Sequence, residues 1–95
     1  MSETCTQTTT IRNAQGLHLR PMNAFTALAS TFESTVQISV DTRGPADGKS
    51  VLSLLGLAAA CGESITIEAA GPDAAAAVAG LVALVDDYFG LGAGD

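Results

Sequence analysis

The chain has 95 residues, of which 47% are hydrophobic and only four are basic, and its formal net charge at pH 7 is −6. A chain of this length is expected to form one domain with a single core, and so acidic a chain is not expected to bind nucleic acid or an anionic membrane. Residues 1–12 lack the basic start and apolar run of a signal peptide, and no stretch is apolar enough to cross a membrane, so we expect a cytoplasmic protein.

The first predicted element is a strand over Thr4–Arg12, because threonine favours strands. After a short loop, apolar residues recur at helical spacing and predict a helix over Leu19–Thr31. Pro21 suits the first turn of that helix because it has no N–H to leave unpaired. His18, the single histidine, is therefore expected at or beside the helix N-cap.

This position of His18 predicts a particular chemistry. The first N–H groups of a helix have no intrahelical acceptor and carry the positive end of the helix dipole, so they attract anions. Arg20 adds a positive charge two residues away. A neutral imidazole is a nucleophile, and a phosphoryl group on it would meet these N–H groups and the guanidinium together. The pattern is typical of a phosphohistidine site, with a merely capping or half-buried histidine as the alternative.

The middle of the chain predicts a hairpin followed by a helix. Thr35–Val40 alternates apolar and polar residues and predicts a strand, and Pro45–Lys49 can form at most a brief edge strand. Ser50 stands where an N-cap would precede a helix over Val51–Ala60, and as a cap it contributes about 1 kcal/mol.

This second helix has more apolar residues than a small core needs. A buried stripe would consist of Leu54, Leu57 and Ala58. A second stripe, Val51, Leu52 and Leu55, is then left for a docking surface, or else the helix is sandwiched between other elements.

The last third of the chain predicts a strand over Ser64–Ala69 and a helix over Ala74–Phe89 with Asp73 as its cap. Residues 1–90 are interpreted as a single domain, and residues 91–95 as a flexible C-terminal tail. Cys5 and Cys61 are expected to be free thiols, with a disulfide as the alternative. Neither the cysteines nor the histidine has metal-site spacing, and no metal or cofactor is expected.

Two motifs in the chain resemble those of one known family. The run Gly16–Pro21 (Gly-Leu-His-Leu-Arg-Pro) resembles the active-site signature of HPr, the histidine-containing phosphocarrier of the sugar phosphotransferase system. The run Gly48–Leu52, followed by Gly62 and Ile65–Ile67, resembles the family's regulatory serine region and the strand after it. The similarity covers residues 6–88. It implies an α+β open-faced sandwich in the order βαββαβα, with a four-stranded antiparallel sheet covered on one face by three helices.

The resemblance also implies a function. His18 would accept a phosphoryl group on its δ nitrogen from phosphorylated enzyme I and pass it to an enzyme II A component, with Arg20 stabilising the phosphate. The chain would be a monomeric carrier with no turnover of its own. A dedicated HPr kinase/phosphorylase would modify Ser50 and weaken the transfer. The residues expected to dock partners are Met22, Asn23, Val51, Leu52 and Leu55.

Some residues depart from the family pattern, and other functions stay open. Leu19 replaces a small residue after the histidine, which puts partner choice in question, and Ser53 stands where kinase-regulated members often have glycine. The carrier could instead serve a nitrogen-related or incomplete phosphotransferase system with a signalling role. A non-transferring regulatory binding module is disfavoured by the presence of both His18 and Arg20. A metal or redox protein has no support from the spacing.

Overall fold

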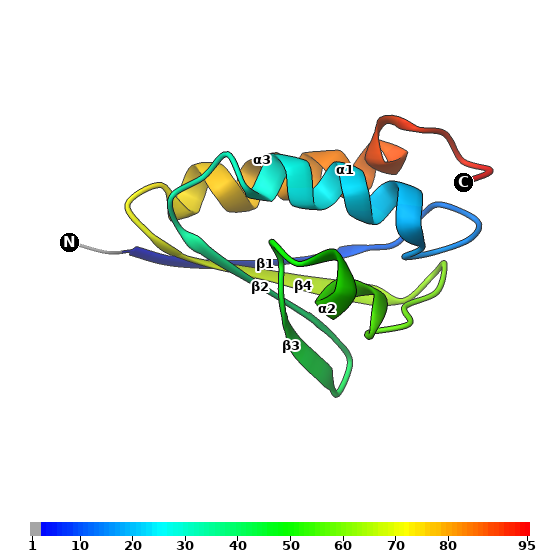
Figure 1. The fold of residues 1–95 in the computed structure, drawn as a ribbon, viewed down its shortest axis with the longest axis horizontal. Helices are drawn as coiled ribbons and strands as arrows, with labels where there is room; N and C mark the ends of the chain where they lie inside the picture. The colour runs from blue at the N-terminus through cyan, green and yellow to red at the C-terminus, as the bar shows by residue number, and fades with distance from the viewer. Residues whose placement is uncertain (1–2) are drawn as a thin grey trace.

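The computed structural model describes residues 3–95 and has the predicted architecture, an antiparallel sheet with helices on one face (Figure 1). The strands lie in the order β1-β4-β2-β3. In chain order the elements are β1 (Glu3–Thr10), α1 (Leu19–Ala29), β2 (Thr35–Val40), β3 (Arg43–Asp47), α2 (Val51–Leu55), β4 (Ser64–Gly71), α3 (Ala74–Asp86) and a 3-10 turn, η1 (Tyr88–Gly90). The predicted βαββαβα order and the open-faced sandwich are confirmed.

The two central strands turn one face to the helices. β4 pairs antiparallel with both β1 and β2, so that Ile67 lies beside Gln7 on one side and Ile38 on the other. Every second residue of β2 and β4 is buried, as the alternating pattern predicts. The opposite face of the sheet carries mainly Thr, Ser, Gln and Glu side chains and is open to solvent.

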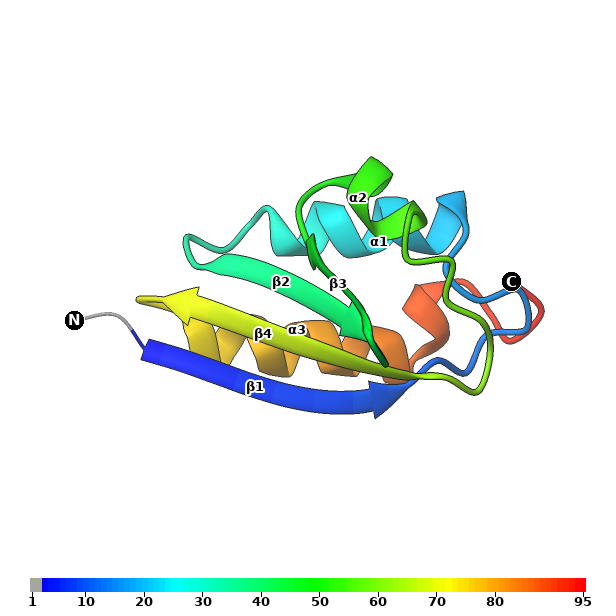
Figure 2. The same cartoon turned by 90° about the horizontal axis from the view of Figure 1, so that it is seen from below.

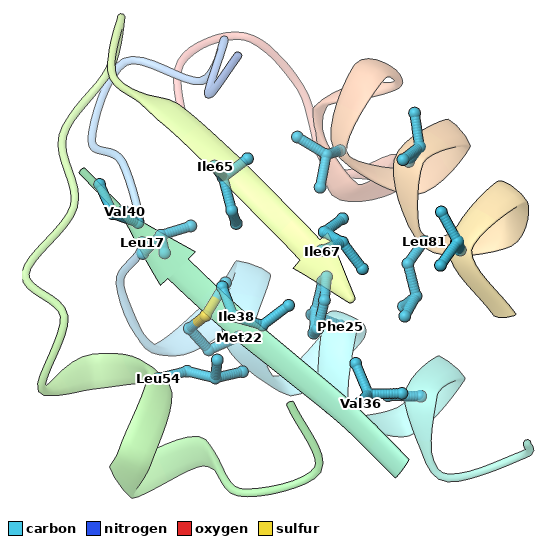
Figure 3. Packing of buried hydrophobic residues seen from close by; sticks show 14 of the residues in the cluster. Leu17, Met22, Phe25, Val36, Ile38, Val40, Leu54, Ile65, Ile67 and Leu81 are labelled. Carbon is cyan, nitrogen blue, oxygen red and sulfur yellow. The ribbon is translucent and has the colours of Figure 1, made fainter. Parts of the chain in front are cut away.

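The core lies between this sheet and the helices (Figure 3). α1 contributes Met22 and Phe25, and α2 contributes Leu54, each about 1% exposed. Burying a side chain of this size stabilises the fold by about 1.5–3 kcal/mol. The assignment of Met22 to a docking surface was therefore wrong, because its side chain points into the core. Its helical spacing with Phe25 already indicated the buried face.

α2 is shorter than predicted and ends at Leu55 rather than Ala60. The chain turns at Gly56, and Ala58 takes a positive φ of 50° that a helix does not contain. The Arg43 guanidinium donates to the main-chain oxygens of Leu57 and Ala58, so β3 binds the carbonyls that a longer helix would use itself. Ala58 is exposed in consequence, contrary to the predicted buried stripe, whereas Leu57 is buried as predicted.

The ends of the other helices also differ from the prediction. α1 stops at Ala29, two residues early, and α3 stops at Asp86 because positive φ angles at Tyr88 and Phe89 break the helix. Phe89 is nevertheless buried in the core from η1. The first strand ends at Thr10, although the N–H of the next residue still donates to the Glu63 carbonyl.

Asp73 does not cap α3 with its side chain. Its carboxylate accepts instead from the N–H groups of Glu33 and Ser34 and from the Ser34 hydroxyl. These hydrogen bonds, the hydroxyl's first, lower the pKa of Asp73. They also join the α1–β2 connection to the start of α3.

The thiols of Cys5 and Cys61 are free, as predicted. Within residues 3–95, no helix is long and apolar enough to span a lipid bilayer. No group of three or more His, Cys, Asp or Glu side chains in that range is arranged to hold a metal ion.

Candidate functional site

The loop between β1 and α1 is held by its own side chains and by the chain after α2. Asn13 is 1% exposed, and its amide Nδ2 donates to the Gly16 carbonyl at 2.6 Å. Gly16 has φ +68°, and a Cβ there would lie 2.4 Å from the Ala59 carbonyl oxygen. The Leu17 N–H donates to that same oxygen at 3.0 Å. Only glycine fits so close a contact at this φ, which explains its place two residues before His18.

His18 is the N-cap of α1, as the sequence predicts. Its backbone is extended, with φ −107° and ψ −173°, and no side chain caps the first turn of the helix. Pro21 occupies the first turn, where its missing N–H costs nothing. The N–H groups of Leu19 and Arg20 have no intrahelical acceptor, so the positive end of an eleven-residue helix is open beside the imidazole.

The imidazole itself is held by the end of the chain. His18 Nε2 lies 2.6 Å from the main-chain oxygen of Asp95. Because that oxygen can only accept, Nε2 is the donor in this contact, and in the neutral ring the lone pair is then on Nδ1. Nδ1 is thus the ring nitrogen free to act as a nucleophile.

Arg20 contacts the same residue through its guanidinium. Its guanidinium Nη1 lies 3.0 Å from Asp95 Oδ1, although the Arg20 side chain is 65% exposed. Figure 1 shows the end of the chain returning to the start of α1. Sequence reasoning missed these contacts, since nothing in the glycine-rich run 90–95 indicates which part of the surface it will meet.

A second helix start belongs to Ser50, the N-cap of α2 as predicted. Its hydroxyl oxygen accepts from the Ser53 N–H at 3.3 Å, so the serine caps its own helix. The neighbouring Lys49 ammonium donates to the Phe32 carbonyl at 2.8 Å. This bond joins the start of α2 to the end of α1, and Figure 2 shows the two helices beside each other.

Two large apolar side chains are exposed within the described residues. Leu52, on α2, is 84% exposed, and Leu19, in the first turn of α1, is 55% exposed. Val51 and Leu55 are half-buried against the core, and Asn23 is exposed on α1. Four of the five predicted docking residues therefore lie at the surface. Leu19 is a further exposed apolar residue that the docking prediction left out. Its place between His18 and Arg20 was the sequence signal that could have identified it.

A family model described as the phosphorylation site of the HPr component of the phosphotransferase system matches residues 5–87. The chain belongs to the HPr family. It is 44% identical over 87 residues to the phosphocarrier protein HPr of Neisseria meningitidis, covering 90% of this chain and 96% of that protein. It is 36% identical over 86 residues, with the same coverage, to the phosphocarrier protein NPr of Escherichia coli.

Solved structures of the family have the same fold. The crystal structure of HPr from Thermoanaerobacter tengcongensis matches with a TM-score of 0.87 and 31% identity, over 93% of this chain and 98% of that one. HPr from Bacillus anthracis matches with a TM-score of 0.79 and 29% identity, over 84% and 94% of the two chains. Membership in the HPr family makes this protein a phosphocarrier whose partners belong to the phosphotransferase system.

Proposed function

We propose that His18 receives a phosphoryl group from phosphorylated enzyme I and passes it to an enzyme II A component. The carrying observation is the geometry of the imidazole, which sits at the open start of α1 with Nε2 turned to the Asp95 oxygen, so that Nδ1 is the nitrogen left for a nucleophilic role in the neutral ring. The Nδ1 lone pair forms the new N–P bond while the N–P bond of the donor histidine breaks, and the electron pair returns to the donor nitrogen. In the second transfer, a nucleophile of the acceptor forms the new bond to phosphorus while the N–P bond to His18 breaks and its electron pair returns to Nδ1.

The site supplies positive charge for the transferred group. The open helix start attracts an anion by about 0.3–1 kcal/mol, and the Arg20 guanidinium adds a permanent charge with several donors. Both contributions are small. The helix end contributes at most about 1 kcal/mol, and the charge of Arg20 is screened because its side chain is mostly in solvent. A modest stabilisation suits a carrier, which must release the phosphoryl group as readily as it accepts it.

Partner docking is proposed for the apolar surface of α2 and the first turn of α1. Leu52 is the leading residue of this surface because nearly all of its side chain is in water, where it does nothing for the fold. Leu19, Asn23, Val51 and Leu55 extend the surface. A single hydrophobic contact region can serve successive partners that bring their own catalytic groups.

Phosphorylation of Ser50 by an HPr kinase/phosphorylase is proposed as regulation of this docking. Ser50 is partly exposed and immediately precedes Val51 and Leu52 in the chain. A phosphate there would add about two negative charges next to the apolar contact region. These charges would oppose docking of a partner whose contact surface is apolar or acidic.

The alternative pathway, a nitrogen-related or signalling phosphotransferase system, is kept as a second candidate. Its support is the similarity to phosphocarrier protein NPr at 36% identity, below the 42% and 44% found for HPr of Cupriavidus necator and Neisseria meningitidis. Both candidates use the same phosphohistidine chemistry. They differ in the partner that removes the phosphoryl group.

The test is incubation with enzyme I and phosphoenolpyruvate, followed by intact mass measurement before and after acid treatment. We expect one acid-labile phosphate on the native chain and none on the His18→Ala variant, whose fold is checked by circular dichroism. Phosphate that still arrives on His18→Ala would assign the site to another residue. No addition in the presence of an active enzyme I would favour the non-transferring binding module.

A further inference from the structure

The peptide unit between Ala59 and Ala60 makes a hydrogen bond at each of its two polar ends. Its carbonyl oxygen accepts from the Leu17 N–H at 3.0 Å, in the loop between β1 and α1 (residues 11–18, the histidine loop). Its N–H, which belongs to Ala60, donates to Glu63 Oε1 at 2.7 Å. The unit is planar and trans, so its carbonyl and its N–H point in opposite directions. The Glu63 carboxylate therefore orients the acceptor of the Leu17 N–H.

Glu63 is itself held by Arg43, which comes from the edge strand β3. The Arg43 guanidinium pairs with Glu63 Oε2, so the two carboxylate oxygens have separate partners. The same guanidinium donates to the Leu57 carbonyl at 2.7 Å and to the Ala58 carbonyl at 3.2 Å. The charged pair thus orients the carbonyls of residues 57 and 58 directly and that of residue 59 through the next peptide unit.

The hydrogen bond to Glu63 also has an electrostatic effect on the peptide unit. The N–H donated by Ala60 is the largest cause that lowers the pKa of Glu63, while desolvation opposes it and the Arg43 charge adds to it. The carboxylate is therefore charged at neutral pH, and a bond to a charged acceptor is roughly twice as strong as one between neutral groups. Such a bond polarises the peptide unit and strengthens its carbonyl as an acceptor for Leu17.

The backbone alone does not favour this arrangement. Ala58 has a φ of +50°, a conformation that is uncommon for a residue with a side chain. The histidine loop also packs directly on the oriented unit, because a Cβ at Gly16 would lie 2.4 Å from the Ala59 oxygen. Rotation of the peptide plane would therefore displace the loop as well as break the hydrogen bond to Leu17.

We propose that Glu63, held by Arg43, is a positioning residue for His18 that acts through the peptide unit between Ala59 and Ala60. The segment that it orients follows α2 directly and so joins the proposed docking surface to the histidine loop. A partner that docks on α2 then meets the imidazole at a fixed place. This inference rests on the proposed function for its effect on transfer and is independent of it for its effect on the loop.

Three variants test the proposal. Glu63→Ala removes the acceptor of the Ala60 N–H, whereas Glu63→Gln keeps an oxygen for that N–H and removes only the charge. Asp73→Ala is the matched control, because Asp73 is also a carboxylate that accepts main-chain N–H groups and has a lowered pKa. It immediately precedes α3, whose start lies at the other end of the sheet from the histidine loop (Figure 1).

The effect on the loop is measured by NMR without any partner, as the scalar coupling across the hydrogen bond between the Leu17 nitrogen and the Ala59 carbonyl carbon. We expect this coupling in the native chain and in Asp73→Ala, a weaker one in Glu63→Gln, and none in Glu63→Ala. A general loss of stability would not remove it from a chain that is still folded. The native coupling in Glu63→Ala, or no coupling in the native chain, would overturn the positioning role.

The effect on transfer is measured with enzyme I and phosphoenolpyruvate over a range of chain concentrations. The docking residues are unchanged, so KM should stay within about twofold of the native value in Glu63→Ala, while kcat should fall about five- to tenfold because the imidazole is misplaced in the docked complex. Glu63→Gln should recover part of this loss, and Asp73→Ala should keep the native kcat and KM. A rise in KM alone, or equal losses of kcat in Glu63→Ala and Asp73→Ala, would contradict the proposal.

The two measurements fail separately from the proposed function. A native chain that shows the coupling between Leu17 and Ala59 but takes no phosphate from enzyme I would refute the proposed partner, and the coupling in the Glu63 variants would then decide the positioning role. If Glu63→Ala does not fold, Glu63→Gln decides it, because a coupling and a kcat identical to those of the native chain would overturn the action assigned to the carboxylate.

Discussion

The starts of the helices in this molecule solve the same physical problem in different ways. α1 begins at His18 with no side-chain cap, so its first N–H groups have neither an intrahelical nor a capping side-chain acceptor. α2 begins at Ser50, whose own hydroxyl accepts from the first turn. α3 begins at Asp73, whose carboxylate turns away to Ser34. Of the two starts without a side-chain cap, that of α1 lies beside the single histidine, whereas that of α3 follows the Asp73 carboxylate, so the start of α1 is the one we propose for an anion.

The two helix starts near the proposed docking surface, those of α1 and α2, also differ in how the rest of the structure supports them. α1 has eleven residues and a loop fixed by Gly16 against Ala59, so its N–H groups and dipole are held in place. α2 has five residues, and Leu54 is its one buried side chain. The longer helix therefore has the stronger dipole end for an anion, and the shorter one presents apolar surface.

The largest effect on stability is expected from Leu54, the one buried side chain of α2. Leu54→Ala removes a side chain that is 1% exposed and should lower the free energy of unfolding by about 2–5 kcal/mol. Leu52→Ala, two residues away and 84% exposed, should change it by less than about 0.5 kcal/mol and should weaken phosphoryl transfer to partners. Urea denaturation compares the two. Equal destabilisation would break the assignment of Leu52 to an external surface.

Gly16→Ala should damage the start of α1. The new Cβ would meet the Ala59 carbonyl oxygen at 2.4 Å with φ at +68°, so the loop must shift at a cost of about 1–3 kcal/mol. Because the loop carries His18, phosphorylation by enzyme I should slow as well. Gly62→Ala is the control, since its φ is also positive but nothing lies within 4 Å of its Cβ position. A folded Gly16→Ala chain with native phosphorylation would contradict the support assigned to this contact.

Substitution of the N-cap residues should lower the free energy of unfolding by a smaller amount, which can be compared directly between α1 and α2. Ser50→Ala removes a cap and should cost about 1 kcal/mol, measured by thermal or urea unfolding. His18→Ala removes no cap bond and should cost only a few tenths of that. Ser50→Asp can still accept from the Ser53 N–H, so it should keep the stability while its charge slows transfer to His18. A stable Ser50→Asp chain with an unchanged transfer rate would remove the regulatory proposal.

The smallest effect concerns the start of α3 and appears in acid. Hydrogen bonds to the Asp73 carboxylate lower its pKa in the folded chain, so the unfolded chain binds the proton more tightly. Its contribution to stability is complete above the unfolded pKa, about 4, and is lost as the pH falls towards the folded pKa. Asp73→Asn should therefore be less stable at neutral pH and should lose less stability on acidification.

The measurement for this effect is the free energy of unfolding in urea as a function of pH. Asp87→Asn is the control, because the Asp87 side chain makes no capping hydrogen bond at the adjoining helix ends. A decline in acid that is equally steep for Asp73→Asn and the native chain would contradict the role assigned to the Ser34 contact.

The sequence predicted the elements of the fold because most signals are local. Alternation predicted β2 and β4, and the proline three residues after His18 indicated a helix start at Leu19 or Arg20, where α1 begins at Leu19. The early end of α2 was not predictable, because the Arg43 guanidinium that takes the Leu57 carbonyl comes from another strand. Asp73 was predicted to cap α3 for the same reason, because the sequence does not show that Ser34 lies within hydrogen-bonding distance of its carboxylate.

The candidate site likewise has residues that the sequence predicted and contacts that it did not. His18, Arg20 and Ser50 were predicted from short motifs, and each lies at a helix start as expected. Met22 was misassigned because its position after the proline was read as surface while its spacing with Phe25 indicated the core. The contact between Asp95 and His18 joins residues 77 apart in the chain, and no local pattern reports such a contact.

The central claim, that the open start of α1 makes His18 Nδ1 the phosphoryl acceptor, has one direct measurement. The chain is labelled with ¹⁵N in its imidazole, phosphorylated with enzyme I and phosphoenolpyruvate, and examined for one-bond phosphorus–nitrogen coupling. Coupling to Nδ1, with the proton retained on Nε2, is the predicted result. Coupling to Nε2, or a phosphate bound to no ring nitrogen, would contradict the account.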